Sequence, residues 1–123
     1  GDWVHGIWET GCFNGGEWHH GTWHSGSWFD GAWRGGLWRS GRWYNGTWYN
    51  GYWNGGAWYN GTWHKGAWLS GDWHDGTWLD GEWHGGEWKG GNWVQGKIRG
   101  KDGKLVYSAV NPAEFYANQE KTL

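Results

Sequence analysis

The sequence repeats with a period of five residues over most of its length. Glycine occupies every fifth position over Gly1–Gly96, and an aromatic residue follows two places later over Trp3–Trp93. Phe13 is the only one of these aromatic residues that is not tryptophan, and Ile98 takes the position in the last, degenerate unit. A period of five residues fits neither the 3.6-residue helix nor a long alternating strand, and recurrent glycine disfavours a helix.

The residue before each glycine is mostly Gly, Asn, Asp or Ser, as in Asn50-Gly51, Asp75-Gly76 and Gly35-Gly36. These dipeptides are typical of turns because Gly and Asn tolerate the positive φ that tight turns require. Each unit is therefore expected to be a short extended piece followed by a corner. A chain that turns the same way at every unit winds into a solenoid, with successive coils about 4.8 Å apart. The predicted fold class is an all-β, single-chain β-solenoid.

The third position of the repeat is the only one that is consistently apolar, so we expect it to form the core. Burying one Trp contributes roughly 4 to 6 kcal/mol, whereas ordering five residues costs about 7 kcal/mol. A leucine would contribute only about 1.5 to 3 kcal/mol. The predicted core consists of Trp3, Trp8, Phe13, Trp18, Trp23, Trp28, Trp33, Trp38, Trp43, Trp48, Trp53, Trp58, Trp63, Trp68, Trp73, Trp78, Trp83, Trp88, Trp93 and Ile98.

The number of units per coil decides which side chains become neighbours. A four-sided coil of 20 residues is predicted, because a triangle would enclose under half of its area while holding three quarters as many indoles. The glycine pairs Gly15-Gly16, Gly35-Gly36 and Gly55-Gly56 recur at this spacing. The alternative is a three-sided coil of 15 residues, a spacing at which two sets align: Thr47, Thr62 and Thr77, and Phe29, Tyr44 and Tyr59.

The pattern resembles the pentapeptide-repeat proteins, which carry a large apolar residue at the centre of each unit and a small residue two places earlier. The resemblance covers residues 1 to 95 and implies a right-handed, four-sided β-helix. Units such as Gly46-Thr-Trp-Tyr-Asn50, with the tail Val110-Asn-Pro-Ala-Glu114, are also similar to Trp-rich repeat arrays in structural proteins of tailed phages, notably marine ones. That similarity implies a virion or extracellular location.

The repeat ends near Lys97, which divides the chain into a solenoid over 1–96 and a C-terminal cap over 97–123. Two β-prone runs around Gly100-Lys-Asp-Gly103 predict a hairpin, or a last strand plus a loop. Asn111-Pro112 predicts the start of a short helix over about 112–121. We expect Phe115, Tyr116 and Leu123 to cover the end of the tryptophan stack, since solenoids need atypical terminal caps.

The amino-terminal end shows no such cap, because Gly1 is already in register with the repeat. An open coil exposes indoles and unpaired strand edges. We therefore expect this face to meet preceding polypeptide or another subunit, in a homo-oligomer or a larger assembly.

Conventional active sites find little support in the sequence. His19, His24, His64, His74 and His84 occupy the fourth, outward position of the repeat, and a four-sided coil would bring only His64 and His84 together. Two imidazoles make a poor zinc site, and a filled solenoid offers no cleft for catalysis. We predict no enzymatic activity, no metal and no cofactor.

Charge and hydropathy exclude two classes of partner. Ten basic and twelve acidic residues leave a formal net charge of −2, without the cationic footprint of a nucleic-acid binder. No apolar stretch approaches the roughly 18 residues that span a bilayer. Neither nucleic acid nor a membrane is expected as a partner.

The outward aromatic and amide residues are the best candidates for a ligand or partner surface, since rings beside amides suit sugars and protein interfaces. In a four-sided coil Phe29, Tyr49 and Leu69 would form one apolar stripe. The competing interpretation is that these rings only stack across strands and stabilise the sheet. The candidates are Phe29, Tyr44, Tyr49, Tyr52, Asn54, Tyr59 and Leu69.

Three functions remain open from the sequence. The leading hypothesis is a non-enzymatic structural or assembly module in a larger fibre or virion component. A carbohydrate-binding or adhesion module that uses the outward Tyr and Asn residues is the alternative. A surface-mimicking inhibitor comes third, because the net charge is weak.

Overall fold

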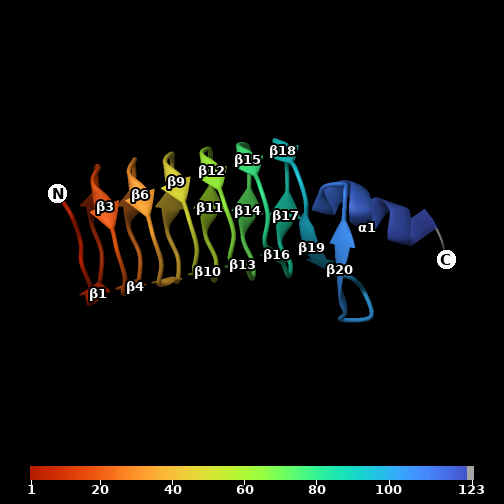
Figure 1. Ribbon diagram of the computed structural model, residues 1–123, viewed down its shortest axis with the longest axis horizontal. Helices are drawn as coiled ribbons and strands as arrows, with labels where there is room; N and C mark the ends of the chain where they lie inside the picture. Colours follow the sequence, from red (N-terminus) through yellow and green to blue (C-terminus); the bar gives the residue numbers. More distant parts are fainter. Residues whose placement is uncertain (122–123) are drawn as a thin grey trace.

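The computed structural model describes residues 1–121, which form a β-solenoid followed by a hairpin and one helix (Figure 1). The coils lie side by side along the long axis of the molecule, with the amino terminus at one end and α1 (Pro112–Lys121) at the other. Three sheets run along this axis, one of eight strands and two of six. The predicted β-solenoid is confirmed.

The strands of the three sheets alternate along the chain. The first sheet contains β1 (Ile7–Trp8), β4 (Thr22–Trp23), β7 (Leu37–Trp38), β10 (Tyr52–Trp53), β13 (Ala67–Trp68), β16 (Glu82–Trp83), β19 (Gly96–Arg99) and β20 (Leu105–Ser108). The second contains β2 (Cys12–Phe13), β5 (Ser27–Trp28), β8 (Arg42–Trp43), β11 (Ala57–Trp58), β14 (Asp72–Trp73) and β17 (Glu87–Trp88). The third contains β3 (Glu17–Trp18), β6 (Ala32–Trp33), β9 (Thr47–Trp48), β12 (Thr62–Trp63), β15 (Thr77–Trp78) and β18 (Asn92–Trp93).

The strand register corrects the predicted coil. Trp23 pairs with Trp8 on one side and with Trp38 on the other, so neighbouring coils are offset by 15 residues and not by 20. The four-sided expectation is wrong because it treated each unit as five extended residues. Only two residues of most units are in β conformation, and the others form the corner, so three short sides suffice to enclose the indoles. The alternative register, which rested on the spacing of the threonines and outer rings, is the observed one.

Main-chain hydrogen bonds join each coil to the next at two points per unit. The N–H group of Tyr52 donates to the carbonyl of Gly36 at 3.0 Å, and that of Asn54 donates to the carbonyl of Trp38 at 2.7 Å. The same pair of bonds recurs around the coil, for example from Ala57 to Gly41 at 3.0 Å. The short strands are therefore stabilised by the repetition of this ladder and not by their length.

The interior consists of three columns of stacked rings. Ring centroids in successive coils lie 4.7 Å apart at Trp38–Trp53 and 5.1 Å apart at Trp68–Trp83, with interplanar angles of 6° and 7°. Consecutive indoles along the chain meet edge to face, at 5.8 Å and 73° for Trp33–Trp38. Every tryptophan from Trp18 to Trp83 has an exposed fraction of 0%. The predicted tryptophan ladders are confirmed.

Hydrogen bonding by the indole nitrogens contributes little to this core. Among the described residues, 14 buried indole N–H groups have no hydrogen-bond partner. Trp38 donates to the carbonyl of Gly55 at 3.1 Å, and Trp43 donates to that of Asn60 at 3.1 Å. The core therefore depends on the burial and stacking of the rings.

The C-terminal elements extend the first sheet and then lead into α1, which lies beyond the last coil along the long axis (Figure 1). β19 pairs in parallel with β16 and antiparallel with β20, which is the predicted hairpin. The Asn111 side chain accepts a hydrogen bond from the backbone N–H of Glu114 at 2.9 Å, capping α1 as predicted. Phe115 and Tyr116 pack against the core. Leu123, expected to help cover this end, lies outside the described residues.

The glycine column is required by backbone conformation and by the close approach of the coils. Gly36 has a φ of +112°, and a Cβ atom there would overlap the carbonyl oxygen of Gly21 in the coil before. Gly35, next to it, is not among the glycines with positive φ, and the nearest atom to its Cβ would be the His19 oxygen at 3.7 Å.

This contrast yields a matched pair of variants. Gly36→Ala is expected to lower the free energy of unfolding by about 2 kcal/mol or more, because it adds positive-φ strain and a backbone overlap. Gly35→Ala should change it by less than about 1 kcal/mol. Urea denaturation followed by tryptophan fluorescence measures both. Equal effects of the two substitutions would contradict this account of the repeat.

Candidate functional site

Aromatic side chains at the fourth repeat position of the second sheet form a ladder on the outer surface. Phe29 and Tyr44 stack at 5.1 Å, Tyr44 and Tyr59 at 5.1 Å, and Tyr59 and His74 at 4.7 Å. The interplanar angles are 6° to 14°. Because each ring covers the face of the next, the faces of the inner rings are not available to a ligand. Only ring edges and hydroxyl groups remain at the surface.

Tyr49 lies in a second outer column, on the third sheet, and both of its faces are also in contact. The Arg34 guanidinium, from the coil before, lies 4.7 Å from the centroid of the Tyr49 ring. The His64 ring, from the coil after, stacks on Tyr49 with a centroid distance of 4.8 Å. Arg34 is held in turn by the Glu17 carboxylate at 2.9 Å. This column is a cross-strand arrangement that stabilises the sheet.

Two predicted neighbour relations are wrong because they assumed the 20-residue register. Phe29, Tyr49 and Leu69 do not form one stripe, since they follow strands of the second, third and first sheets in turn. His64 and His84 are likewise on different sheets, the third and the first. In the observed 15-residue register His64 stacks on Tyr49 instead.

Tyr52 differs from the other tyrosines of the repeat. It lies at the second position of the repeat, as the first residue of β10, with an exposed fraction of 60%, and has no ring or cation partner among the described residues. Its cross-strand neighbours are Leu37 and Ala67, which offer no ring to stack on. Asn54 and Leu69 follow β10 and β13 on the same sheet, and Leu69 is 39% exposed.

A shallow groove runs along the corner between the third and first sheets, and we call it the corner groove. It encloses about 510 Å³. A second hollow of about 160 Å³ continues it toward β20 and shares Gly81 and Glu82 with it. The corner groove is lined by His20, Gly35, Gly36, Asn50, Gly51, Tyr52, Gly66, Ala67, Gly81 and Glu82.

The sequence predicted a filled solenoid without a cleft, and it did not predict this groove. The hollow opens where the side chains along the corner are smallest, at the glycine pair Gly35-Gly36 and at Ala67 beside Tyr52. The glycine pair is visible in the sequence, but its proximity to Ala67 follows only from the 15-residue register.

A polar cluster joins the last coil to the hairpin. The Nε and Nη2 atoms of Arg99 lie 3.0 and 2.8 Å from Nδ1 of His84, and Nε2 of His84 lies 3.1 Å from the Glu82 carboxylate. Because arginine only donates, Nδ1 of His84 accepts, and Nε2 carries the proton and donates a hydrogen bond to the Glu82 carboxylate. Arg99 also donates to the carbonyl of Gly103 at 2.7 Å. Sequence analysis did not identify this cluster, which fastens the hairpin.

Tyr116 fastens α1 to the same hairpin. Its hydroxyl donates a hydrogen bond to the carbonyl of Arg99 at 2.9 Å. Burial raises the pKa of Tyr116 above its ordinary value, and the positive charge of Arg99 opposes this effect.

The chemistry available elsewhere in the described part of the chain is limited. No three His, Cys, Asp or Glu side chains of the described residues come close enough together to hold a metal ion. Cys12 is an exposed free thiol. Among residues 1–121, no helix has the length and apolar character needed to cross a membrane.

Comparisons with family models, with curated proteins and with solved structures give no match to this chain. The architecture itself, a β-solenoid with a tryptophan strand every five residues, is consistent with a pentapeptide-repeat-like fold.

The raised pKa of Tyr116 predicts how stability depends on alkaline pH. Because folding favours the protonated hydroxyl, its contribution is present below the unfolded pKa near 10 and is lost as the pH rises through the folded pKa. Tyr116→Phe should therefore show a shallower loss of unfolding free energy between about pH 9 and 11 than the unaltered protein. Urea denaturation across this range measures the difference. Parallel pH profiles would contradict the assignment.

Proposed function

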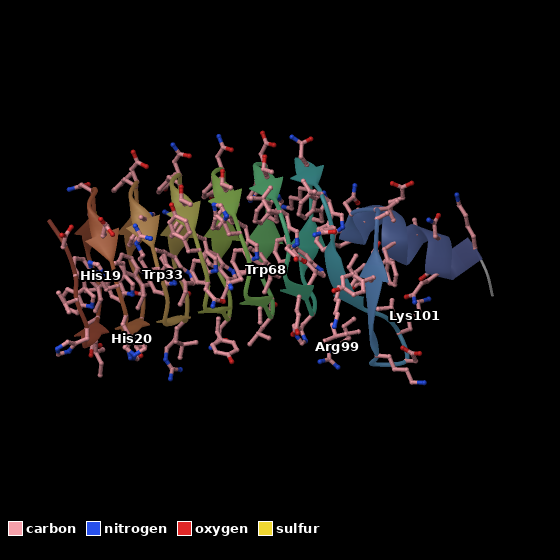
Figure 2. The ribbon with its side chains drawn as sticks, in the orientation of Figure 1. His19, His20, Trp33, Trp68, Arg99 and Lys101 are labelled. Atoms are coloured by element: carbon pink, nitrogen blue, oxygen red, sulfur yellow. The ribbon has the colours of Figure 1, made fainter. Side chains whose placement is uncertain are left out.

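We propose that this protein is a non-enzymatic structural module, a rigid solenoid that acts as a spacer or assembly element in a larger fibre or particle. The observation that carries the proposal is the unbroken stack of buried indoles from Trp18 to Trp83. Figure 2 places Trp33 and Trp68 within the interior, along the axis of the solenoid. Bending such a rod would separate stacked rings and stretch the main-chain ladder on one side, so the fold resists bending.

The amino-terminal face supports a role in assembly. Trp3, Trp8 and Phe13 stack only on the coil that follows, at 5.0, 5.1 and 4.1 Å. Val4 and Ile7 beside them are 62% and 58% exposed. Apolar rings next to open strand edges favour pairing with further β-structure. We propose that this face meets preceding polypeptide or a second copy of the chain.

The proposed setting is a virion or an extracellular structure, and it rests on resemblance. The units of the form Gly46–Asn50 and the tail Val110–Glu114 are similar to Trp-rich arrays in structural proteins of tailed phages. A surface-mimicking inhibitor is less well supported, because the net charge of −2 gives no strong field to imitate a charged polymer.

Rigidity is tested with two spin labels on one strand column. Cys12 is the natural thiol, and Glu87→Cys places a second thiol five coil steps away in the second sheet. Double electron–electron resonance should give one narrow distance distribution. After the length of the labels is allowed for, it should centre near 24 Å, because five coil steps of about 4.8 Å separate the two thiols. The distribution should not change with salt. A broad or salt-dependent distribution would refute the rigid spacer.

Association through the amino-terminal face is tested by analytical ultracentrifugation. The unaltered chain should associate as its concentration rises, and Val4→Lys with Ile7→Lys should prevent this by placing charge on the apolar edge. Val94→Lys with Val106→Lys, which adds the same number of charges at exposed positions near the opposite end, is the control and should associate normally. A chain that stays monomeric at every concentration rules out the homo-oligomer.

A further inference from the structure

Tyr52 is the one tyrosine whose ring has no partner among the described residues. Tyr44 and Tyr59 stack in the outer ladder, and Tyr49 lies between Arg34 and His64 in its column. Lys97 lies over the Tyr107 ring at 5.2 Å, and Tyr116 contacts Phe115 edge to face. The 60% exposed ring of Tyr52 instead borders the corner groove. Tyr52 is therefore the tyrosine of the repeat whose ring is open to a ligand.

Much of the main chain along the floor of the groove is already hydrogen-bonded. The N–H group of Gly51 donates to the side chain of Asn50 at 2.9 Å, and the Gly51 carbonyl accepts from Ala67 at 3.0 Å. The carbonyls of Gly36 and Gly66 accept from Tyr52 and Glu82. An extended peptide, which is recognised largely through main-chain hydrogen bonds, would find few partners there. Recognition of a ligand in this groove therefore depends mainly on side chains.

The side chains along the groove suit hydroxyl groups. The Asn50 side-chain oxygen accepts a hydrogen bond from Gly51, which leaves the amide nitrogen as a donor. His20 has no hydrogen-bond partner within residues 1–121 and lies at the rim of the solenoid (Figure 2). The Glu82 carboxylate, 46% exposed, provides acceptors at the other end. One imidazole, one amide and one carboxylate give a groove without a strong charge of either sign.

The length of the groove suits a chain molecule. Its lining runs from the coil of His20 to the coil of Glu82, four coil steps of about 4.8 Å, or roughly 19 Å. The adjoining hollow, with Lys65 and Lys97 on its walls, carries it on toward β20. The glycine floor lets a flat ligand approach the backbone closely.

We propose that the corner groove binds a linear, neutral oligosaccharide, with one sugar ring stacked on Tyr52 and the hydroxyl groups of this ring and its neighbours bonded to Asn50, Glu82 and His20. An aromatic face flanked by amide and carboxylate groups offers both the apolar and the hydrogen-bonding contacts that a sugar ring presents. This binding site goes beyond the proposed structural role and does not depend on it.

The proposal is tested first on an array of neutral hexose and N-acetylhexosamine oligosaccharides, with fluorescently labelled protein. The best-bound oligosaccharide is then titrated calorimetrically. Tyr52→Ala should weaken binding about tenfold or more, because the stacking face is removed. Ala67→Phe should do the same by a different route, since the small, buried Ala67 side chain lies next to Tyr52 in the groove lining, and a ring there fills the groove beside Tyr52. Because phenylalanine is favoured in β-strands, this substitution should leave the fold intact, which near-ultraviolet circular dichroism can verify.

Tyr44→Ala is the matched control, because it removes a tyrosine of the outer ladder that does not line the groove. It should leave the affinity for the oligosaccharide within about twofold. Absence of binding to every oligosaccharide on the array overturns the proposal. Binding that persists in both Tyr52→Ala and Ala67→Phe also overturns it, since the sugar would then lie elsewhere. Either failure leaves the spin-label and sedimentation tests of the structural role unaffected.

Discussion

The repeat distance of the β-ladder governs this molecule. Parallel strands lie about 4.8 Å apart, and the indoles they carry are stacked 4.7 to 5.1 Å apart by centroid. Hydrogen bonding of the backbone and stacking of the rings are therefore satisfied by one and the same spacing. Because the two requirements agree, strands of only two residues can build a continuous core. Glycine at each corner permits this spacing, since a Cβ at Gly36 would meet the backbone of the coil before it.

The same spacing organises the outer surface into columns. A side chain always has the residue 15 positions away as its neighbour, so a ring beside a ring produces a ladder, as at Tyr44 and Tyr59. A ring beside a methyl group leaves a ring open, as at Tyr52 and Ala67. Tyrosines that look alike in the sequence thus differ in whether their rings can bind a ligand. The interior is occupied by indoles, so ligand recognition in the repeat must take place on these columns and at the corners between them.

Much of the fold could be predicted from the residues, and the candidate surface much less. The turn dipeptides and the tryptophan column led to the β-solenoid and its core, and Asn111-Pro112 led to the start of α1. The four-sided coil was wrong, and with it the expected stripe of Phe29, Tyr49 and Leu69. The corner groove and the Glu82–His84–Arg99 cluster were missed, because both bring together residues on different strands.

The periodic sequence by itself determined that the chain turns every five residues, that tryptophan fills the interior, and that the repeat ends in a hairpin and a helix. These are local matters, decided by φ at glycine, by the size of the indole and by the cap at Asn111. Only the tertiary structure decided how many turns complete a coil. Every unit is compatible with three sides or four, and the choice depends on how the indoles of one coil meet edge to face. That choice sets which residues are neighbours, and so leaves Tyr52 open beside Ala67 while its counterparts are covered.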